Sequence, residues 1–220
     1  MQARRLIVFD VDGTLIDSQQ QILDSMALAF RMAGLPMPAR KVALSVVGLS
    51  LPEAMARLMP EVPDGDRAEL LDAYRQGFAA SRTRAASPLY PGARAALEGL
   101  TARHELVLGV ATGKSRRGLT HLLDQHDLHR FFATTQVADD HPSKPHPSML
   151  EAALREAGGA PQTAVMIGDT TFDMEMGRAA GFRTIGVTWG YHDADKLRAA
   201  GADRLVSDFP ALTAALEGYR

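Results

Sequence analysis

The chain contains no cysteine, one tryptophan and only 6% aromatic residues. The absence of cysteine excludes disulfide bonds, thiolate metal sites and cysteine nucleophiles. An excess of charge of one sign is also missing, because 24 Lys and Arg residues face 26 Asp and Glu residues, which gives a net charge of −2. Nucleic-acid-binding proteins depend on a concentrated basic surface, so this balance argues against nucleic acid as a partner.

Long hydrophobic runs are absent as well. The first apolar run, residues 6–9, stops at Asp10 and is too short for a signal-peptide core or a membrane span. We therefore expect a cytoplasmic protein without a membrane partner. Its 220 residues, 46% hydrophobic and 23% charged, are ordinary for a globular chain. This length fits one large domain or a core with an insertion.

Hydrophobic periodicity divides the chain at residues 88–92, where two prolines and a glycine mark a junction. Before the junction the pattern is helical, and helices are predicted from Ser18 to Gly34 and over residues 51–59 and 66–86. Ser18, with Gln21 three residues later, matches a capping box at the start of the first helix.

After the junction, strands and helices alternate. Strands are predicted over residues 106–111, 132–136, 164–167, 184–187 and 204–206. Helices are predicted over residues 115–125, 147–156, 172–180, 193–200 and 210–216. With a first strand at 6–9, this order predicts an α/β fold, a doubly wound parallel sheet with helices on both faces and an all-helical insertion. We expect the core to span 1–16 and 89–220 and the insertion 17–88.

Acidic side chains follow two of these strands where each ends. Asp10 and Asp12 follow the first strand, and their spacing in extended backbone turns both carboxylates to one side. Asp169 follows the strand over 164–167, and Asp173 lies in the next helical turn. Turns and helix caps could explain each acid alone. Acids at two strand ends favour one oxygen-rich site, of the kind that Mg²⁺ prefers.

The second strand is followed by Thr112, Gly113, Lys114 and Ser115. This stretch is similar to a nucleotide-binding P-loop, but position 108 is Leu where that motif needs Gly, so the loop is too short. A P-loop kinase or ATPase is thereby disfavoured. A hydroxyl, a glycine backbone and a helix N-terminus still form a small anion site. Thr112 and Gly113 are therefore candidate phosphate-binding residues, with Thr112 as a plain strand terminator the alternative.

Lys144 lies in a loop between Ser143 and Pro145, with Pro147 close behind. Pro145 favours an extended conformation for Lys144, and Pro147 suits the first turn of a helix. A cation fixed in this way can neutralise an acid cluster. An isolated loop lysine would instead be solvated.

Three further groups are weaker candidates. We expect surface positions for three histidines, because their spacing does not suit zinc ligation. They are His121, His126 and His129. We expect the basic residues of the insertion to form its solvent face, and the alternative is that one or two of them reach a substrate. These residues are Arg57, Arg75, Arg82 and Arg84. A role at the mouth of a pocket, or simple packing, is expected for Trp189, Tyr191 and His192.

Taken together, these residues resemble the haloacid dehalogenase-like phosphatases, in the phosphoglycolate-phosphatase-like branch with a helical cap. The four motifs of that family occur in order, as Asp-Val-Asp-Gly-Thr-Leu-Ile-Asp-Ser at 10–18, Val-Ala-Thr-Gly at 110–113, Lys-Pro at 144–145 and Gly-Asp-Thr-Thr-Phe-Asp at 168–173. The resemblance spans essentially the whole chain. The helical segment falls between the first and second motifs, where the family carries its cap.

The resemblance implies a phosphatase that forms an aspartyl phosphate. Asp10 would be the nucleophile, and Asp12 would be the general acid for the leaving alcohol and then the base for water. Lys144 would neutralise Asp10 and the charge of the substrate. Phosphoryl transfer demands an in-line nucleophile and preorganised positive charge, which this set of residues supplies.

The resemblance also implies a ligand set for Mg²⁺ and a phosphate site. Asp10, Asp169 and the main-chain carbonyl of Asp12 would hold the ion, with Asp173 as a further ligand or as a partner of the ligands. Thr112, the amide of Gly113, and Lys144 would bind the phosphoryl group. The expected substrate is a small phosphorylated metabolite similar to phosphoglycolate, and the expected protein is a monomer or homodimer.

Two features depart from the family pattern. Gly113 stands where many relatives carry Asn, and the loop at 47–50 has no basic cluster that would single out the carboxylate of phosphoglycolate. A phosphosugar mutase of the β-phosphoglucomutase type shares all four motifs, but such relatives carry a His early in the cap and residues 18–32 contain none. A non-catalytic module that binds phosphorylated metabolites is disfavoured because no carboxylate or lysine of the set is missing.

Overall fold

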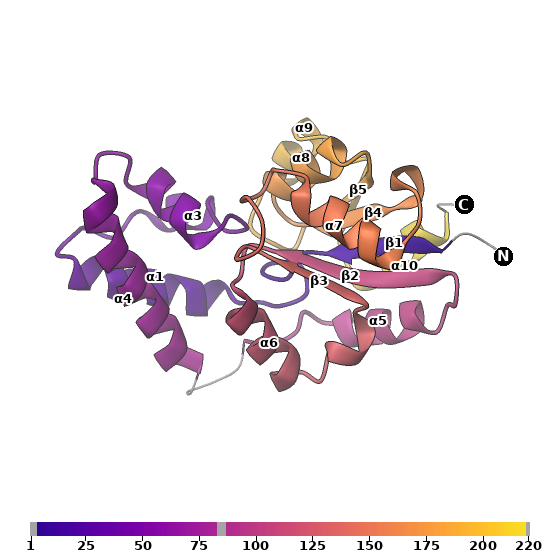
Figure 1. The fold of residues 1–220 in the computed structure, drawn as a ribbon, viewed down its shortest axis with the longest axis horizontal. Coiled ribbons are helices and arrows are strands. Elements are labelled where there is room, and N and C mark those ends of the chain that lie inside the picture. The colour runs from indigo at the N-terminus through magenta and orange to yellow at the C-terminus, as the bar shows by residue number, and fades with distance from the viewer. Residues whose placement is uncertain (1–3, 83–86, 219–220) are drawn as a thin grey trace.

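The computed structural model describes residues 4–82 and 87–218, in which a parallel sheet stands beside a group of helices (Figure 1). The sheet has six strands in the order β3-β2-β1-β4-β5-β6. The strands are β1 (Arg5–Phe9), β2 (Leu106–Thr112), β3 (Thr134–Val137), β4 (Val165–Gly168), β5 (Arg183–Val187) and β6 (Arg204–Val206). All neighbouring pairs are parallel, which confirms the predicted α/β class.

The helices divide into an insertion and a set that covers the sheet. The insertion, on the left of Figure 1, consists of α1 (Gln19–Met32), α2 (Arg40–Leu44), α3 (Leu51–Leu58) and α4 (Asp64–Arg82). The sheet carries α5 (Ala93–Thr101), α6 (Arg116–Gln125), α7 (Ser148–Ala157), α8 (Thr171–Ala179), α9 (Ala194–Ala199) and α10 (Phe209–Glu217). Within the described ranges, no helix is both long and apolar enough to cross a membrane.

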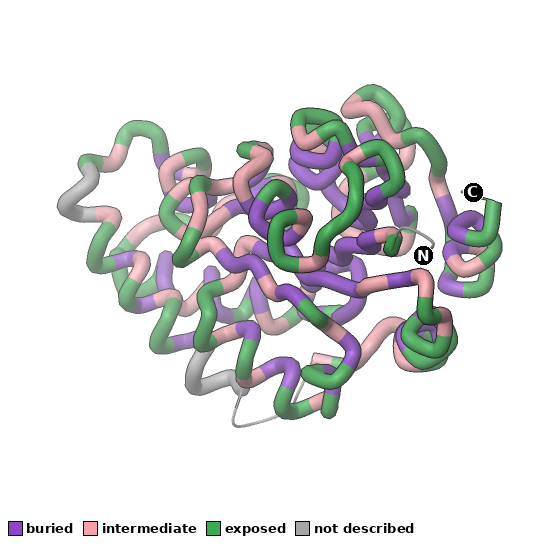
Figure 2. Tube along the Cα trace, turned by 45° about the vertical axis from the view of Figure 1, so that its right-hand side comes forward, coloured by how far each residue is buried: buried purple, intermediate pink, exposed green. Residues whose placement is uncertain are grey.

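The central strand β1 is buried on both faces. Its residues alternate, so that Leu6 and Val8 join the cluster that includes α7 and α8, while Ile7 and Phe9 join the cluster that includes α5, α6 and α10. Figure 2 shows this buried centre of the sheet in purple. A strand covered on both faces reads as a continuous apolar run, which is why residues 6–9 are so uniformly hydrophobic.

The helical insertion has a hydrophobic core of its own. Met26, Phe30, Met55 and Leu70, from three different helices, belong to one buried cluster. Phe172 from the start of α8 is part of the same cluster. The insertion therefore packs on the sheet domain through an apolar contact close to the carboxyl ends of the strands.

Two helices were not predicted from the sequence. The short α2 lies in a segment without a clear pattern, and α5 directly follows the junction at 88–92. Buried side chains of α5 recur at helical spacing, namely Ala93, Ala96, Leu97 and Leu100. The helix starts after Gly92, whose φ of 87° lies in the left-handed region. In the sequence, the two prolines and the glycine at 88–92 indicate only a turn, so the helix that follows was not predicted. The predicted helix over 66–86 begins at Asp64, and its last four residues lie outside the described ranges.

The predicted capping box at Ser18 is wrong. Ser18 stands before α1, but its side chain makes no capping hydrogen bond. Its hydroxyl contacts Asp12 and Tyr191 instead of a backbone N–H group of the helix. The predicted strand over 132–136 is also shifted, since β3 begins at Thr134 after a 3₁₀ turn at His129–Phe131.

Candidate active site

Three neighbouring strands bring the predicted site residues to one edge of the sheet. β1 lies between β2 and β4, with Phe9 in register with Val110 on one side and Ile167 on the other. The chain continues from these strands into Asp10 and Asp169, and Thr112 is the last residue of β2. The amide of Asp10 donates to the carbonyl of Ile167 at 2.9 Å, which fixes the two acidic ends together. Such a strand edge is where open α/β sheets bind ligands.

Asp10, Asp169 and Asp173 form a buried cluster of carboxylates. One oxygen from each lies within 4.8 Å of the others, and no side chain of the three is more than 1% exposed. Oδ2 of Asp10 has no hydrogen-bond partner among the described residues. Buried polar atoms are almost always paired, so this oxygen is available to a ligand.

Lys144 supplies the positive charge inside this cluster. Its Nζ donates to Oδ1 of Asp10 at 2.6 Å and to Oδ1 of Asp173 at 2.7 Å, and the side chain is fully buried. Burial lowers the pKa of the ammonium, but the two carboxylates outweigh it and raise the pKa above its ordinary value. Lys144 is therefore held charged between two acids rather than solvated as an isolated loop lysine would be.

Both oxygens of Asp169 and Oδ2 of Asp173 accept hydrogen bonds from the protein. Oδ2 of Asp173 accepts from the amide and hydroxyl of Thr170, completing a capping box at the start of α8. Asp169 accepts from the Thr14 hydroxyl at 2.9 Å and from the Tyr191 amide at 2.8 Å. Asp173 thus serves both as a helix cap and as a partner of Lys144.

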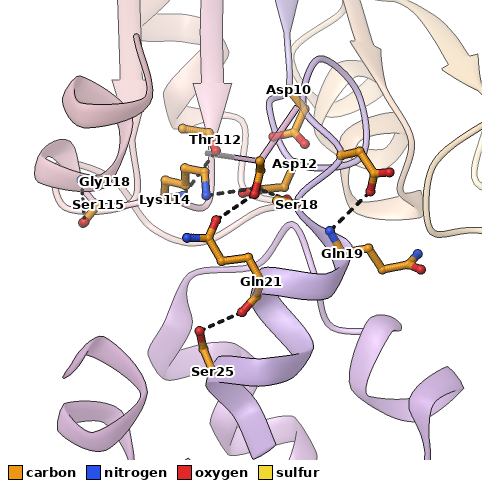
Figure 3. A network of polar contacts seen from close by, with 12 residues as sticks. Asp10, Asp12, Ser18, Gln19, Gln21, Ser25, Thr112, Lys114, Ser115 and Gly118 are labelled. Atoms are coloured by element: carbon orange, nitrogen blue, oxygen red, sulfur yellow. Dashed lines mark hydrogen bonds and ion pairs between the residues drawn. The ribbon is translucent and has the colours of Figure 1, made fainter. Parts of the chain in front are cut away.

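Asp12 lies outside the three-carboxylate cluster and faces a different set of groups (Figure 3). Nζ of Lys114 lies 2.9 Å from Oδ1 of Asp12, and the Ser18 hydroxyl donates to the same oxygen. The Tyr191 hydroxyl is 3.1 Å from that of Ser18. Asp10 and Asp12 of the first motif therefore have separate partners, Lys144 for Asp10 and Lys114 for Asp12.

Thr112 and Gly113 lie where the insertion meets the sheet. The Thr112 hydroxyl accepts from the amide of Lys114 at 3.2 Å and keeps its own proton available for a ligand. A Cβ on Gly113 would lie 2.3 Å from the carbonyl oxygen of Leu49 and 2.6 Å from that of Gly48. The backbone of the insertion thus occupies the space that a side chain at position 113 would need.

A cavity of about 380 Å³ lies between the insertion and the strand ends. Its floor includes Asp10, Asp12 and Thr112, and the insertion contributes a mainly apolar wall. That wall is lined by Ile22, Met26, Val46, Val47, Leu49, Ala54, Tyr74 and Phe78. Its size is within the range of roughly 300–1,000 Å³ typical of small-molecule sites.

Polar contacts join the insertion to the sheet domain around this cavity. The amide of Ser50 donates to the Ser143 hydroxyl at 2.9 Å, directly beside Lys144. His192 accepts from the Thr171 amide at Nδ1, which leaves Nε2 to donate to the carbonyl of Ser45 at 3.3 Å. Burial lowers the pKa of His192, so this neutral form is favoured near pH 7.

The weaker sequence candidates have mixed positions. Tyr191 and His192 contact the site and the insertion as described, and Trp189 Nε1 donates to the carbonyl of Thr14 at 3.1 Å. Arg75 lines the cavity, and Arg57 lies over the Phe172 ring at 5.1 Å. Arg84 and the side chain of Arg82 lie outside what the structure describes. Of the three histidines expected at the surface, His129 is exposed and contacts Asp124, whereas His126 is half-buried against the carbonyl of Ser87. His121 is also half-buried, and its Nε2 has no hydrogen-bond partner among the described residues.

Comparison with known proteins assigns the family. The model of the haloacid dehalogenase-like hydrolases matches residues 7–187. The chain belongs to this family. A probable phosphatase, IndB of Dickeya dadantii, is 34% identical over 96% of this chain and 92% of its own length. A phosphoglycolate phosphatase of Agrobacterium fabrum is 30% identical over 96% of this chain and 91% of its own length.

Solved structures of similar proteins have the same fold as this haloacid dehalogenase-like hydrolase. A hydrolase from Pseudomonas syringae superposes with a TM-score of 0.86 at 26% identity, covering 97% of this chain and 98% of the other. A haloacid dehalogenase-like family protein from Streptococcus pneumoniae gives 0.84 at 26% identity, covering 98% and 99%. The protein is accordingly a hydrolase of the phosphatase type.

Ionising all the acids of this site is costly without a further cation. Three buried carboxylates face the single ammonium of Lys144. Burial raises the pKa of Asp10 to about 7 even though Lys144 lowers it, and burial with the neighbouring Asp10 raises that of Asp169 well above its usual range. A divalent cation on these oxygens would relieve that cost, and the unpartnered Oδ2 of Asp10 is placed to bind one.

Sequence reasoning missed the parts played by Ser18 and Lys114. Local patterns indicate only a helix cap for Ser18 and only a P-loop-like stretch for Lys114. Each contacts Asp12 across a long or irregular connection, so no local pattern predicts the pairing. The available signal for Lys114 was its place two residues after Thr112, at the end of a strand adjacent to that of Asp12.

Proposed function

We propose that the protein is a Mg²⁺-dependent phosphomonoesterase that acts on a small phosphorylated metabolite through a phosphorylated Asp10. The observation that carries the proposal is the carboxylate of Asp10. One of its oxygens is fixed by Lys144 at 2.6 Å, and the other has no partner among the described residues. A carboxylate held in this way at the floor of a cavity is a competent covalent nucleophile.

The side chains around Asp10 perform the other tasks. The Thr112 hydroxyl and the Gly113 amide bind phosphoryl oxygens at the cavity floor, and Lys144 offsets the negative charge of Asp10 as it approaches the phosphoryl group. Asp12 donates a proton to the oxygen of the leaving alcohol and then takes one from the water that hydrolyses the phosphorylated Asp10. Ser18 and Lys114 orient Asp12 for both transfers.

Oxygen ligands for Mg²⁺ come from Asp10, Asp169 and the main-chain carbonyl of Asp12. Asp173 acts from outside, because its Oδ1 pairs with the ammonium of Lys144 and its Oδ2 accepts two hydrogen bonds from Thr170. Each oxygen of Asp169 accepts only one hydrogen bond from the described residues. When bound, Mg²⁺ polarises a phosphoryl oxygen and reduces its repulsion with the nucleophile. The cluster of three carboxylates and the unpartnered oxygen support this assignment.

A phosphoglycolate-like phosphomonoester is the substrate class that the relatives support. Relatives named phosphoglycolate phosphatase align over nearly the whole chain, at 30% and 28% identity in two cases. The cavity of about 380 Å³ has room for a small metabolite. Its apolar upper wall keeps water away from the strand ends when a substrate fills it.

The insertion acts as a cap in this proposal, with residues 17–88 resting on a core of 1–16 and 89–220. An isolated β-bridge joins Ile16 and Leu89, and the amide of Asp17 donates to the carbonyl of Pro88 at 2.9 Å. The two connections therefore run side by side at the proposed boundary. A short paired connection allows the cap to move as a unit, admitting water after the phosphoryl group has been transferred.

Hydrolysis of p-nitrophenyl phosphate tests the proposed function. We expect turnover with Mg²⁺, a fall to below about 1% after EDTA, and recovery when excess Mg²⁺ is restored, because the carboxylates need a cation to approach an anionic substrate. Release of nitrophenol is the readout, and a panel of phosphorylated metabolites including 2-phosphoglycolate then defines the substrate. Turnover that is unaffected by metal removal would contradict the proposal.

Mg²⁺ is also expected to stabilise the fold more at pH 8 than at pH 5.5. The pKa of Asp10 is raised from 3.8 to about 7, so between these values the metal-free folded protein holds a proton that the unfolded chain has lost. The bound proton stabilises the metal-free fold. Its contribution is fully present below pH 3.8 and is lost as the pH rises through about 7. Mg²⁺ must displace the same proton, so its binding weakens as the pH falls.

Thermal unfolding with EDTA or saturating Mg²⁺ measures this difference. At pH 8, Mg²⁺ at a concentration about a hundred times its dissociation constant should raise the free energy of unfolding by about 2.7 kcal/mol. For a chain of this size, that corresponds to an increase in Tm of roughly 5–10 °C. Asp195, whose side chain is 96% exposed, gives the control D195N, which should leave the increment unchanged. An increment that is equal or larger at pH 5.5 would rule out ion binding at these carboxylates.

A further inference from the structure

Besides the exposed Arg75 and Arg117, the cavity is lined by Lys114, which has no assigned contact with a substrate. Its side chain is only 9% exposed and its Nζ lies 2.9 Å from Oδ1 of Asp12. The cap residue Arg75 also lines the cavity, but it is 60% exposed and paired with Asp72 at 2.9 Å. An ammonium has three N–H donors, and a single contact to Asp12 leaves capacity for a further acceptor.

The contact between Lys114 and Asp12 puts Lys114 on the leaving-group side of the proposed reaction. In the proposed reaction, which this inference rests on, Asp12 protonates the leaving oxygen, so groups that contact Asp12 lie beside the alcohol part of the substrate. Lys144 contacts Asp10 and Asp173 instead, and so belongs to the phosphoryl side. Two successive hydrogen bonds span roughly 5–6 Å, which brings substituents on the first carbons of the alcohol within reach of Lys114.

We propose that Lys114 binds an oxyanion on the leaving alcohol, and thereby selects phosphomonoesters whose alcohol part carries a carboxylate close to the ester oxygen. The selecting group is on the core, at the end of β2, and not in the cap loop at 47–50, which lacks a basic cluster. Its contact with Asp12 holds the ammonium at the position where such a carboxylate arrives together with the leaving oxygen.

The cap completes the binding site for this oxyanion. The ring of Phe78 from α4 lies 4.9 Å from Nζ of Lys114, and Tyr74 stacks on Phe78 with ring centroids 5.9 Å apart. These rings place apolar surface beside the ammonium and reduce its exposure to water. A charge pair in such surroundings is stronger than one in bulk solvent, so the preference for an oxyanion depends on the closed cap.

The test compares two phosphomonoesters of matched size, 2-phosphoglycolate and 2-hydroxyethyl phosphate, with p-nitrophenyl phosphate as a reference. We expect the wild type to favour the carboxylate in kcat/KM. K114M should lower kcat/KM for both substrates, because Lys114 also orients Asp12. The loss for 2-phosphoglycolate should exceed the loss for 2-hydroxyethyl phosphate by about 10- to 100-fold, the effect of one hydrogen bond between two charged groups.

Two variants sharpen the result. K114R keeps the positive charge and should retain part of the preference for the carboxylate. K41M removes a cap lysine that is 84% exposed and should leave kcat/KM for both substrates unchanged. Equal losses on both substrates in K114M, or no preference in the wild type, would overturn the inference, since Lys114 would then act only through Asp12. A wild type unable to hydrolyse p-nitrophenyl phosphate would instead reject the proposed function, and the inference with it.

Discussion

Replacing Asp10 with Asn is expected to abolish turnover while preserving the fold. Asn has nearly the same size and shape but its amide is not a nucleophile, so the phosphorylated enzyme cannot form. Loss of an essential nucleophile typically lowers kcat on the order of 10⁴-fold or more. The ammonium of Lys144 keeps its contact with Asp173 at 2.7 Å, so the site is not left without a pair.

The stability of D10N should not fall with its activity. Burial raises the pKa of Asp10 to about 7, which means that its ionised form is disfavoured in the metal-free site. Removing that charge should leave the thermal midpoint in EDTA near pH 8 unchanged or higher, as thermal unfolding monitored by circular dichroism would show. The control D24N alters an exposed acid on α1 whose carboxylate accepts a hydrogen bond from exposed Gln20. Turnover by D10N comparable to the wild type would exclude Asp10 as the nucleophile.

Replacing Lys144 with Met is expected to cost both activity and stability. The change leaves Oδ1 of Asp10 and of Asp173 without their shared ammonium in a fully buried site. Removing one partner of a buried ion pair typically costs about 3–5 kcal/mol, which for a chain of this size lowers Tm by roughly 10 °C. Urea unfolding in EDTA at pH 8 measures the loss directly.

A double variant separates lost charge pairing from lost packing. Asn at position 173 keeps an oxygen for the helix cap with Thr170 but removes one of the stranded charges. K144M/D173N should therefore recover part of the stability lost in K144M, a coupling that a double-mutant cycle reports. The matched control K196M changes an exposed lysine of α9. If K144M were as stable as the wild type, the acids would not depend on this ammonium.

The sequence was sufficient to predict the sheet because each strand carries its own signal. Apolar runs bounded by glycine, proline or acids mark the strands to within two residues, and the alternation with helices implies a parallel order. The same rule predicted that acids after β1 and β4 converge, and Asp10 and Asp169 do so. Both acids follow the carboxyl end of a strand, and the carboxyl ends of adjacent parallel strands lie at the same edge of the sheet.

The parts that were not predicted depend on contacts between distant segments. Ser18 follows local rules for a helix cap, yet its hydroxyl bonds to Asp12 because Asp12 and Tyr191 are packed beside it. Lys114 meets Asp12 from a neighbouring strand, and Phe78 reaches Lys114 from the cap. Tertiary contacts of this kind override local preference and have no periodic signature.

The close approach of the cap backbone to Gly113 has a consequence for engineering. The carbonyl oxygen of Leu49 lies only 2.3 Å from the position that the Cβ of any other residue would take at 113. A cap transplanted from a relative with Asn at this position would bring a loop shaped around that amide, and Asn grafted here alone would collide with the present loop. Chimaeras should therefore exchange position 113 together with the segment around Leu49, because the two are sterically coupled.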